Sequence, residues 1–374
     1  MFTRSRRTVA IVSAFAAAAL TLSACGSSDD AAVSPVAVES STSAGASTTT
    51  DTAASSAPSS DTAAPSSSGE AASSSAGSSS ADPSSAETPG VTFNLEPDQK
   101  RITTAEVPEI AAKVPAAIRE RGKLIVTGSA GTAPPLSFYA TDDQTIIGSE
   151  VDIAHLIGNV LGLDVEYQAA DWAQNFVRID SGEVDAFISN VTVTEERKEK
   201  YDFATYRQDN LAFEALKGSG LKIEKPADIA GHKIAVGSGT NQEALLVAWD
   251  KENQAAGLPA ADIQYYQNST DYYLALSSGR IDLYFGPYPT AEYHAAVTGE
   301  TEVVGNFSGA GDTLQGLIAV LTLKDNGLVG PISEAINHVI ENGTYGEVLA
   351  RWADTGEAVT KSEINPPGLP KTES

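Results

Sequence analysis

The sequence SGEVDA at residues 181–186 has a close counterpart, SGRIDL, at residues 278–283. In both, a glycine suited to the left-handed position that ends a helix is followed by an apolar run typical of a buried strand. Any junction between a helix and a strand shares some of these features. The same pattern nevertheless occurs at matching points in two successive runs of strands and helices. This repetition favours a two-lobed α/β architecture over one continuous sheet.

The same alternation of strands and helices extends on both sides of these junctions. Runs of β-branched and aromatic residues predict strands, and apolar residues recurring at helical spacing predict helices. The predicted strands are 123–127, 164–167, 184–188, 233–236, 263–266, 281–285 and 317–323. The predicted helices are 151–161, 176–180, 241–252, 271–277, 328–341 and one that ends near residue 352.

Charge and composition exclude several classes of function. The 374 residues include 24 Lys and Arg against 49 Asp and Glu, a formal net charge of −25. This balance argues against a nucleic-acid partner, which requires clustered positive charge. One Cys excludes an internal disulfide, and the four His are scattered without a pair at metal-ligand spacing. We therefore expect no metal and no other cofactor.

The beginning of the chain indicates export. Three Arg precede an apolar run over residues 8–22, a pattern typical of a secretory signal peptide, here residues 1–24. The run ends in LSAC at 22–25, which resembles the bacterial lipobox and implies that Cys25 is diacylated. The alternative is a small-residue cleavage site beside an incidental Cys. Two acyl chains would suffice for a stable membrane anchor.

A low-complexity segment follows. Residues 26–90 are mostly Ser, Ala, Thr, Gly and Pro, with eight acidic residues and no Lys or Arg. Such a composition cannot bury enough apolar surface to offset chain entropy. We therefore expect residues 25–90 to be a disordered, lipid-anchored linker.

Seven short motifs occur in the order typical of extracytoplasmic solute-binding proteins, family 3, which serve ABC importers of polar amino acids. The chain resembles this family from about residue 108 to residue 353. The motifs are PAAIRERGKLIV at 115–126, PPLSF at 134–138, GSEVDIA at 148–154, SGEVDAFISNVTVTEER at 181–197, DF at 202–203, DIAGHKIAVGSGT at 228–240 and NGTYGEVLARW at 342–352.

The resemblance implies a type II periplasmic-binding-protein-like fold, with a ligand cleft between two lobes and two crossing strands as a hinge. Lobe one would comprise residues 122–206 and 306–356, and lobe two residues 207–305. We expect residues 91–121 to be an N-terminal extension packed on lobe one. The Pro-rich tail, residues 357–374, is expected to be extended and frayed.

Carried over by position, the resemblance makes Arg197 the anchor for a ligand carboxylate, which its planar fork can bind through two parallel hydrogen bonds. Thr192 would add a hydroxyl and a backbone N–H, and Asn190 would offer carbonyl oxygens to a ligand amine. The alternative for Arg197 is a surface ion pair at the start of a helix.

Three further positions complete the implied cleft. Trp172 would pack on the ligand, although a core Trp is the alternative. Across the cleft, Thr240 and Asn241 begin a helix whose N–H groups favour an anion, or form an ordinary N-cap.

The chain also departs from the family pattern. The Asp that grips the ligand ammonium in this family falls at Pro287, which offers neither charge nor N–H. The usual aromatic and acidic positions upstream fall at Ala133 and Ala130. Candidate replacements are Tyr288, Tyr206 and Gln315, with Asp209 as an alternative ammonium partner.

The sequence thus predicts a monomeric, lipid-anchored receptor without catalytic activity. It would capture a small carboxylate-bearing solute, an amino acid or a similar molecule, and deliver it to the permease of an ABC importer. Two alternatives stay open. One is a dehydratase acting on a cyclic carboxylic acid in the same cleft, and the other is a ligand-sensing module of a signalling partner.

Overall fold

The computed structural model describes residues 85–88, 91–130 and 134–371. The predicted signal peptide, Cys25, most of the predicted linker and Ala133 lie outside these residues. The part of that linker that the structure describes, strand β1 (Ser85–Thr88), pairs antiparallel with β2 (Val91–Asn94).

Lobe one is built on a mixed sheet. Strands β3 (Lys123–Gly128) and β6 (Asp164–Ala169) are parallel, and β3 also runs parallel to β7 (Ala186–Phe187). Strand β13 (Gly316–Leu323) is antiparallel to β7. Buried β3 side chains such as Leu124 share one apolar core with three helices, because these helices turn their apolar faces to the sheet. They are α3 (Ser149–Leu161), α8 (Val329–Glu341) and α9 (Thr344–Arg351).

Lobe two repeats this plan with β9 (Lys233–Val236), β10 (Asp262–Tyr265), β11 (Leu283–Pro287) and β12 (Thr301–Ser308). Strand β9 is parallel to both β10 and β11, and Phe213 stacks on Phe285 at 4.1 Å between ring centroids. Phe213 and Phe285 belong to an apolar cluster that is separate from the cluster around Leu124.

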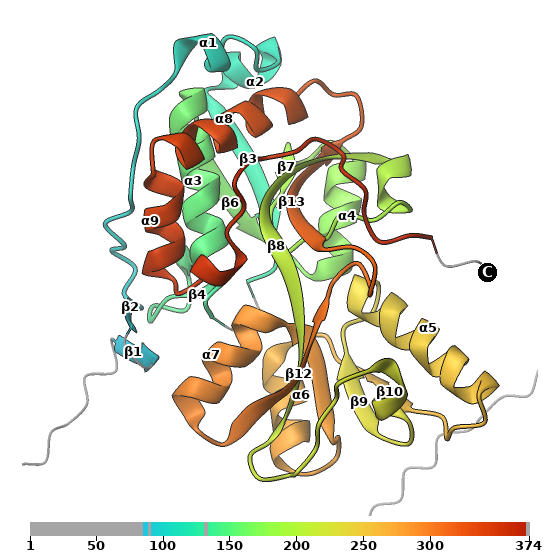
Figure 1. Ribbon diagram of the computed structural model, residues 1–374. Helices are drawn as coiled ribbons and strands as arrows, with labels where there is room; N and C mark the ends of the chain where they lie inside the picture. Colours follow the sequence, from blue (N-terminus) through green and yellow to red (C-terminus); the bar gives the residue numbers. More distant parts are fainter. Residues whose placement is uncertain (1–84, 89–90, 131–133, 372–374) are drawn as a thin grey trace, which may run out of the picture. The chain divides into compact units, whose positions relative to one another are not determined.

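One long strand joins the lobes. Strand β8 (Tyr201–Leu216) pairs with β13 from Tyr201 to Asp209, and with β11 and β12 beyond that point. It runs through both halves in Figure 1. The second crossing lies between β12 and β13. The sheet is thus connected through β8, while the helices and cores form two lobes within one compact unit, Gly77–Ser374.

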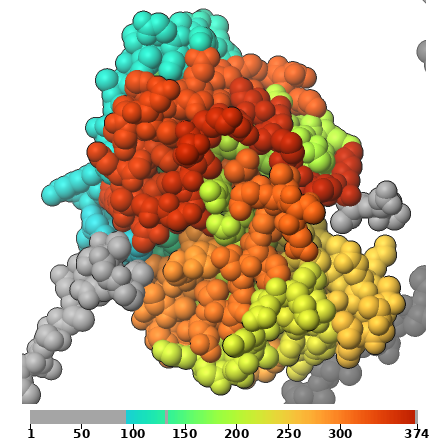
Figure 2. Space-filling view, viewed as in Figure 1, coloured from blue at the N-terminus to red at the C-terminus, as the bar shows by residue number. Residues whose placement is uncertain are grey.

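The helices and short strands complete the fold. The helices are α1 (Pro108–Ala111), α2 (Ala116–Arg121), α3 (Ser149–Leu161), α4 (Trp172–Asp180), α5 (Asn241–Ala255), α6 (Ser269–Ser277), α7 (Tyr288–Thr298), α8 (Val329–Glu341) and α9 (Thr344–Arg351). The remaining elements are β4 (Phe138–Tyr139), β5 (Ile146–Ile147) and the 3-10 turns η1 (Arg197–Glu199), η2 (Pro226–Ile229) and η3 (Thr355–Glu357). Figure 2 shows one lobe formed largely by teal and red residues and the other by orange and yellow ones.

The two ends of the described chain both touch the two lobes. In the N-terminal extension, buried Phe93 stacks on Tyr293 of α7 in lobe two and also contacts the tilted ring of Trp352 in lobe one. The tail is bound rather than frayed. Leu369 exchanges backbone hydrogen bonds with Val193 and Glu195, because the extended Pro-rich chain supplies the partners that this edge otherwise lacks.

Candidate functional site

A cavity of about 190 Å³ lies between the lobes, where loops follow the carboxyl ends of parallel strands. From lobe one it is lined by Ser129, Leu136, Glu150, Ala170, Asp171, Trp172, Ser189 and Asn190. From lobe two it is lined by Gly237, Ser238, Thr240, Gln242, Tyr266, Gln267, Asn268, Ser269, Tyr272, Tyr284, Phe285, Gly286 and Pro287. Helices α4, α5 and α6 begin at this cavity, so it combines aromatic faces with polar helix ends.

Three predicted site residues reach this cavity. Trp172 and Asn190 line it from lobe one, and Thr240 lines it from lobe two. Thr240 is also an N-cap, since its hydroxyl accepts a hydrogen bond from the backbone N–H of Glu243. Asn190 has a positive φ of 50°, which turns its backbone N–H towards the carboxylate of Glu150, 2.7 Å away.

Arg197 lies beside the cavity rather than in its wall. Its Nη1 donates to the carbonyl of Thr192, and its Nη2 donates to the carbonyl of Gly239 in lobe two, both at 3.0 Å. The guanidinium also lies 5.4 Å from the ring centre of Trp172. Burial lowers the pKa of Arg197 to about 10, so the side chain remains a cation at neutral pH.

The carbonyl of Gly239 is a contact between the lobes. It accepts hydrogen bonds from Arg197 and from Nε1 of Trp172, the latter at 3.2 Å. Gly239 has a φ of +74°, a conformation that L side chains rarely adopt, and an added Cβ would lie 3.6 Å from Trp172 Nε1. The loop therefore reaches across to lobe one because it carries glycine at this point.

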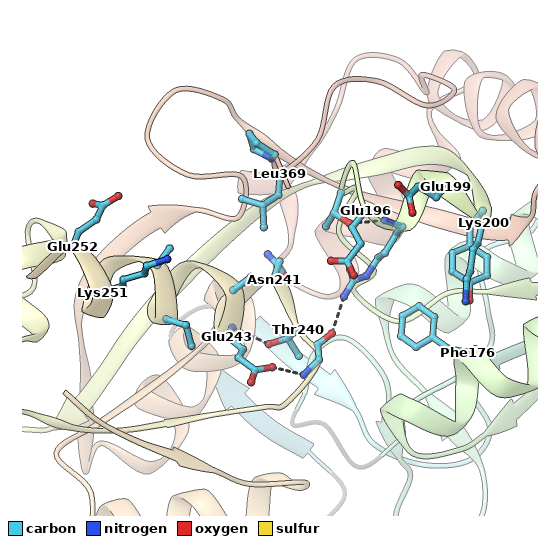
Figure 3. Close-up of a pocket in the computed structure, with 18 of the residues that line it drawn as sticks. Phe176, Glu196, Glu199, Lys200, Thr240, Asn241, Glu243, Lys251, Glu252 and Leu369 are labelled. Carbon is cyan, nitrogen blue, oxygen red and sulfur yellow. Dashed lines mark hydrogen bonds between the residues drawn. The ribbon is translucent and has the colours of Figure 1, made fainter. Parts of the chain in front are cut away.

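A larger groove of about 1020 Å³ has Arg197, Thr240 and Asn241 in its wall. Figure 3 shows Thr240 and Asn241 there. The groove runs between η1 with Phe176 and the exposed flank of α5, where Glu243, Lys251 and Glu252 lie. The groove is open to solvent and carries scattered charges of both signs. The smaller cavity is the better candidate site, because strand-end loops of both lobes enclose it.

Thr192 and Asn241 meet at Asp209 instead of lining the cavity. The Thr192 hydroxyl and the Asn241 amide donate to Oδ2 of Asp209 at 2.7 and 3.0 Å, and all three side chains are buried. Burial raises the pKa of Asp209 to about 6, although the hydrogen bond from Thr192 opposes this shift. These contacts join lobe one, β8 and lobe two at the hinge.

Two predicted residues lie away from the cavity. Tyr288 is the first residue of α7, whose start turns it towards Glu292 and Trp352 in a different pocket. Gln315 lies on the second crossing segment, where its amide donates to the carbonyl of Asp209 at 3.3 Å. Pro287 itself lines the cavity. Tyr206 is buried beside it and donates to Glu150 at 2.7 Å.

Glu150 was not among the predicted site residues. It lies in the first turn of α3 within GSEVDIA and is completely buried. Its Oε1 accepts hydrogen bonds from Tyr206, Asn190 and Arg207, whereas its Oε2 has no hydrogen-bond partner among the described residues. The sequence does not indicate that an acidic residue at a helix start will line a cavity, because its burial depends on the whole fold.

Arg207 is the centre of a buried charge network. It contacts the carboxylates of Glu150 and Glu357, and the carboxylate of Asp354 lies close enough to interact with it. Burial raises the pKa of Glu357 to about 8 and also raises that of Asp354. One guanidinium therefore faces three carboxyl groups behind the cavity.

Within the described ranges no group of His, Cys, Asp and Glu side chains is arranged to hold a metal ion. In the same residues no helix is both long and apolar enough to cross a membrane.

A family model, bacterial extracellular solute-binding proteins, family 3, matches residues 125–355. The L-cystine-binding protein TcyJ of Escherichia coli K12 is 31% identical over 245 residues, 65% of this chain and 86% of TcyJ. The arginine-binding protein ArgT of Corynebacterium glutamicum is 28% identical over 268 residues, 71% of this chain and 86% of ArgT.

Solved structures show the same fold. An ancestral arginine-binding protein bound to arginine has a TM-score of 0.55 at 26% identity, covering 62% of this chain and 98% of that protein. The ancestral amino-acid-binding protein AncCDT-1, a precursor of cyclohexadienyl dehydratase, also has a TM-score of 0.55 at 26% identity, with 63% and 97% covered. The expected two-lobed binding-protein fold is confirmed.

Proposed function

Because the chain belongs to the bacterial extracellular solute-binding proteins, family 3, we propose that it is the substrate-binding component of an ABC importer. It captures a small polar solute with a carboxylate, an amino acid or a close analogue, and delivers it to a membrane permease. The observation that carries this proposal is the cavity enclosed by strand-end loops of both lobes, with Arg197 at its edge. Relatives named for cystine and arginine binding support the same class of ligand.

Arg197 supplies the carboxylate anchor in this proposal. A ligand carboxylate takes the place of the Gly239 carbonyl as acceptor for the guanidinium, which can then form two parallel charge-assisted bonds. The backbone N–H groups at the start of α5 add a favourable partial positive charge opposite Arg197. Trp172 and Tyr272 provide apolar faces for the rest of the ligand.

The protein acts by binding alone in this proposal. The relatives TcyJ and ArgT are named as binding proteins, and AncCDT-1 is an amino-acid-binding protein despite its link to a dehydratase. No cofactor is assigned, and the protein works as a monomer that closes around its ligand.

The proposed location is the extracytoplasmic face of the cell membrane, with lipid on Cys25 as the anchor. We expect C25S to release the protein into the medium, because one residue carries both acyl chains. Fractionation of cells expressing wild type and C25S measures this directly. Equal membrane retention of the two proteins would contradict the anchor.

A thermal-shift screen of the purified protein tests the proposed function. The probes are the L-amino acids including cystine, simple carboxylates and simple amines. A ligand at 100 times its Kd stabilises the folded state by about 2.7 kcal/mol, a shift of a few degrees in Tm. We expect at least one amino acid to produce it. No shift with any amino acid or carboxylate would contradict the proposal.

A further inference from the structure

The walls of the interlobe cavity have a distinct charge inventory. The described residues of these walls include two acids, Glu150 and Asp171, and no Lys or Arg. Asp171 is exposed at the start of α4, whereas Glu150 is completely buried. The inner part of the cavity therefore contains a single carboxylate, and its position is fixed by the fold.

The two oxygens of Glu150 have different environments. Oε1 accepts from the hydroxyl of Tyr206 and the N–H of Asn190, each at 2.7 Å, and from Arg207 at 3.2 Å. Oε2 has no hydrogen-bond partner among the described residues, although it too is buried. A buried polar atom without a partner is costly, so an unpaired oxygen on a residue that lines a binding cavity favours a ligand group that donates to it.

The charges behind Glu150 favour a cationic donor. Arg207 is the one guanidinium in contact with Glu150 and Glu357, and Asp354 adds a third carboxyl group to the same cluster. Oδ1 of Asp354 also lacks a partner among the described residues. Since burial raises its pKa to about 8, the Glu357 carboxyl is protonated at neutral pH, and a positive charge brought close to the cluster would favour the ionised form of these carboxyl groups.

Asp209 is a second buried acid near the hinge, but it does not line the cavity. Its Oδ2 accepts from Thr192 and Asn241, whereas its Oδ1 has no partner among the described residues. Pro287, which lines the cavity from β11, can neither supply a charge nor donate an N–H. Among the described residues, Glu150 is therefore the buried carboxylate that lines the cavity.

We propose that Oε2 of Glu150 binds the ammonium group of the ligand, which makes the ligand a solute with both an ammonium and a carboxylate. This inference rests on the proposed function. It places the ligand ammonium inside the cavity, while Arg197 binds the ligand carboxylate at the edge of the same cavity. Glu150 thereby determines specificity for α-amino acids over their des-amino analogues.

The experiment compares probes that differ by the amino group alone. They are L-arginine with 5-guanidinovalerate, and L-cystine with 3,3′-dithiodipropionate, measured by isothermal titration on wild type and E150Q. We expect wild type to prefer the amino acid of at least one pair by tenfold or more, and E150Q to lose most of that preference. The substitution keeps the shape of the side chain but removes the charge that favours the ammonium.

The matched control is D164N, which removes an exposed acid of lobe one that does not line the cavity, and it should keep the wild-type preference. If E150Q fails to fold, E150D retains the charge but shortens the side chain by one methylene, and should reduce the preference at least threefold.

Unchanged preference in the folded variant would overturn the assignment. Wild type that binds the des-amino analogues but no amino acid would overturn it while leaving carboxylate capture intact. Binding of none of the four probes or of the amino-acid panel would overturn both proposals.

Discussion

The guanidinium of Arg197 contacts both lobes and the aromatic ring of Trp172, so its planar shape matters as well as its charge. The position of Arg197 in the motif SGEVDAFISNVTVTEER predicts it as the anchor for a ligand carboxylate. The local sequence could not predict that the Gly239 carbonyl would occupy Nη2, since that contact forms only when the lobes meet.

We expect R197A to weaken amino-acid binding at least 100-fold and R197K at least tenfold. Lys retains the charge, but a point-like ammonium cannot make two parallel bonds to a carboxylate. Isothermal titration with the best amino acid from the thermal-shift screen measures both effects. K200A is the matched control, because Lys200 is an exposed cation in the same groove and should bind like wild type. Wild-type affinity in R197K would contradict a bidentate role.

Other single positions show where sequence reasoning stopped. Counting from the predicted strand 281–285 put Pro287 just after its end, and in the structure Pro287 is the last residue of β11. Counting did not reveal that α7 begins at the next residue and carries Tyr288 away from the cavity. Glu150 was missed for a related reason, because the burial of an acid and the state of each of its oxygens depend on the whole fold.

Several elements that belong to one lobe were predicted closely, although α7 (Tyr288–Thr298) and β12 (Thr301–Ser308) of lobe two were not predicted. The expected helix 151–161 is α3 (Ser149–Leu161), and the expected strand 233–236 is β9 (Lys233–Val236). The long β8 was not predicted, because the polar run RQDN at 207–210 interrupts its apolar pattern. Those polar residues are where the strand passes from one lobe to the other, so they serve the hinge rather than a core.

The C-terminal segment links the lobes. Leu369 pairs through its backbone with lobe one, while its side chain belongs to the apolar cluster of lobe two with Leu245 and Trp249. We expect L369A to lower the free energy of unfolding by about 2 kcal/mol, as for other truncations of buried Leu. Denaturant unfolding measures this.

I364A is the control on the same segment, because Ile364 is 48% exposed and should change the unfolding free energy by no more than about 0.5 kcal/mol. Equal effects of the two substitutions would contradict a specific role for the Leu369 side chain.

At the scale of the whole molecule, Asp209 lies where the lobes and the hinge meet. Its hydrogen bonds join Thr192 of lobe one to Asn241 at the start of α5 in lobe two. Since its pKa is raised to about 6 from an ordinary 3.8, the folded protein binds a proton that the unfolded chain has released between these values. Its contribution to stability therefore falls as pH rises from about 4 to about 6 and is constant above that.

We expect D209N to remove this part of the pH dependence. Relative to wild type, the variant should gain up to about 3 kcal/mol between pH 4 and pH 7, the free-energy equivalent of the pKa shift. Urea unfolding of both proteins over this pH range gives the difference directly, and titrations elsewhere cancel in it. Parallel stability profiles would contradict a raised pKa at Asp209.

We propose above that an amino acid binds between the lobes of the protein. A crystal structure of the protein with the best ligand of the thermal-shift screen tests it most directly. We expect the ligand in the cavity between Trp172 and Pro287, with its carboxylate on Arg197 in place of the Gly239 carbonyl and its ammonium within hydrogen-bond distance of Glu150. A ligand seated in the groove along α5, or elsewhere outside the interlobe cavity, would contradict the account.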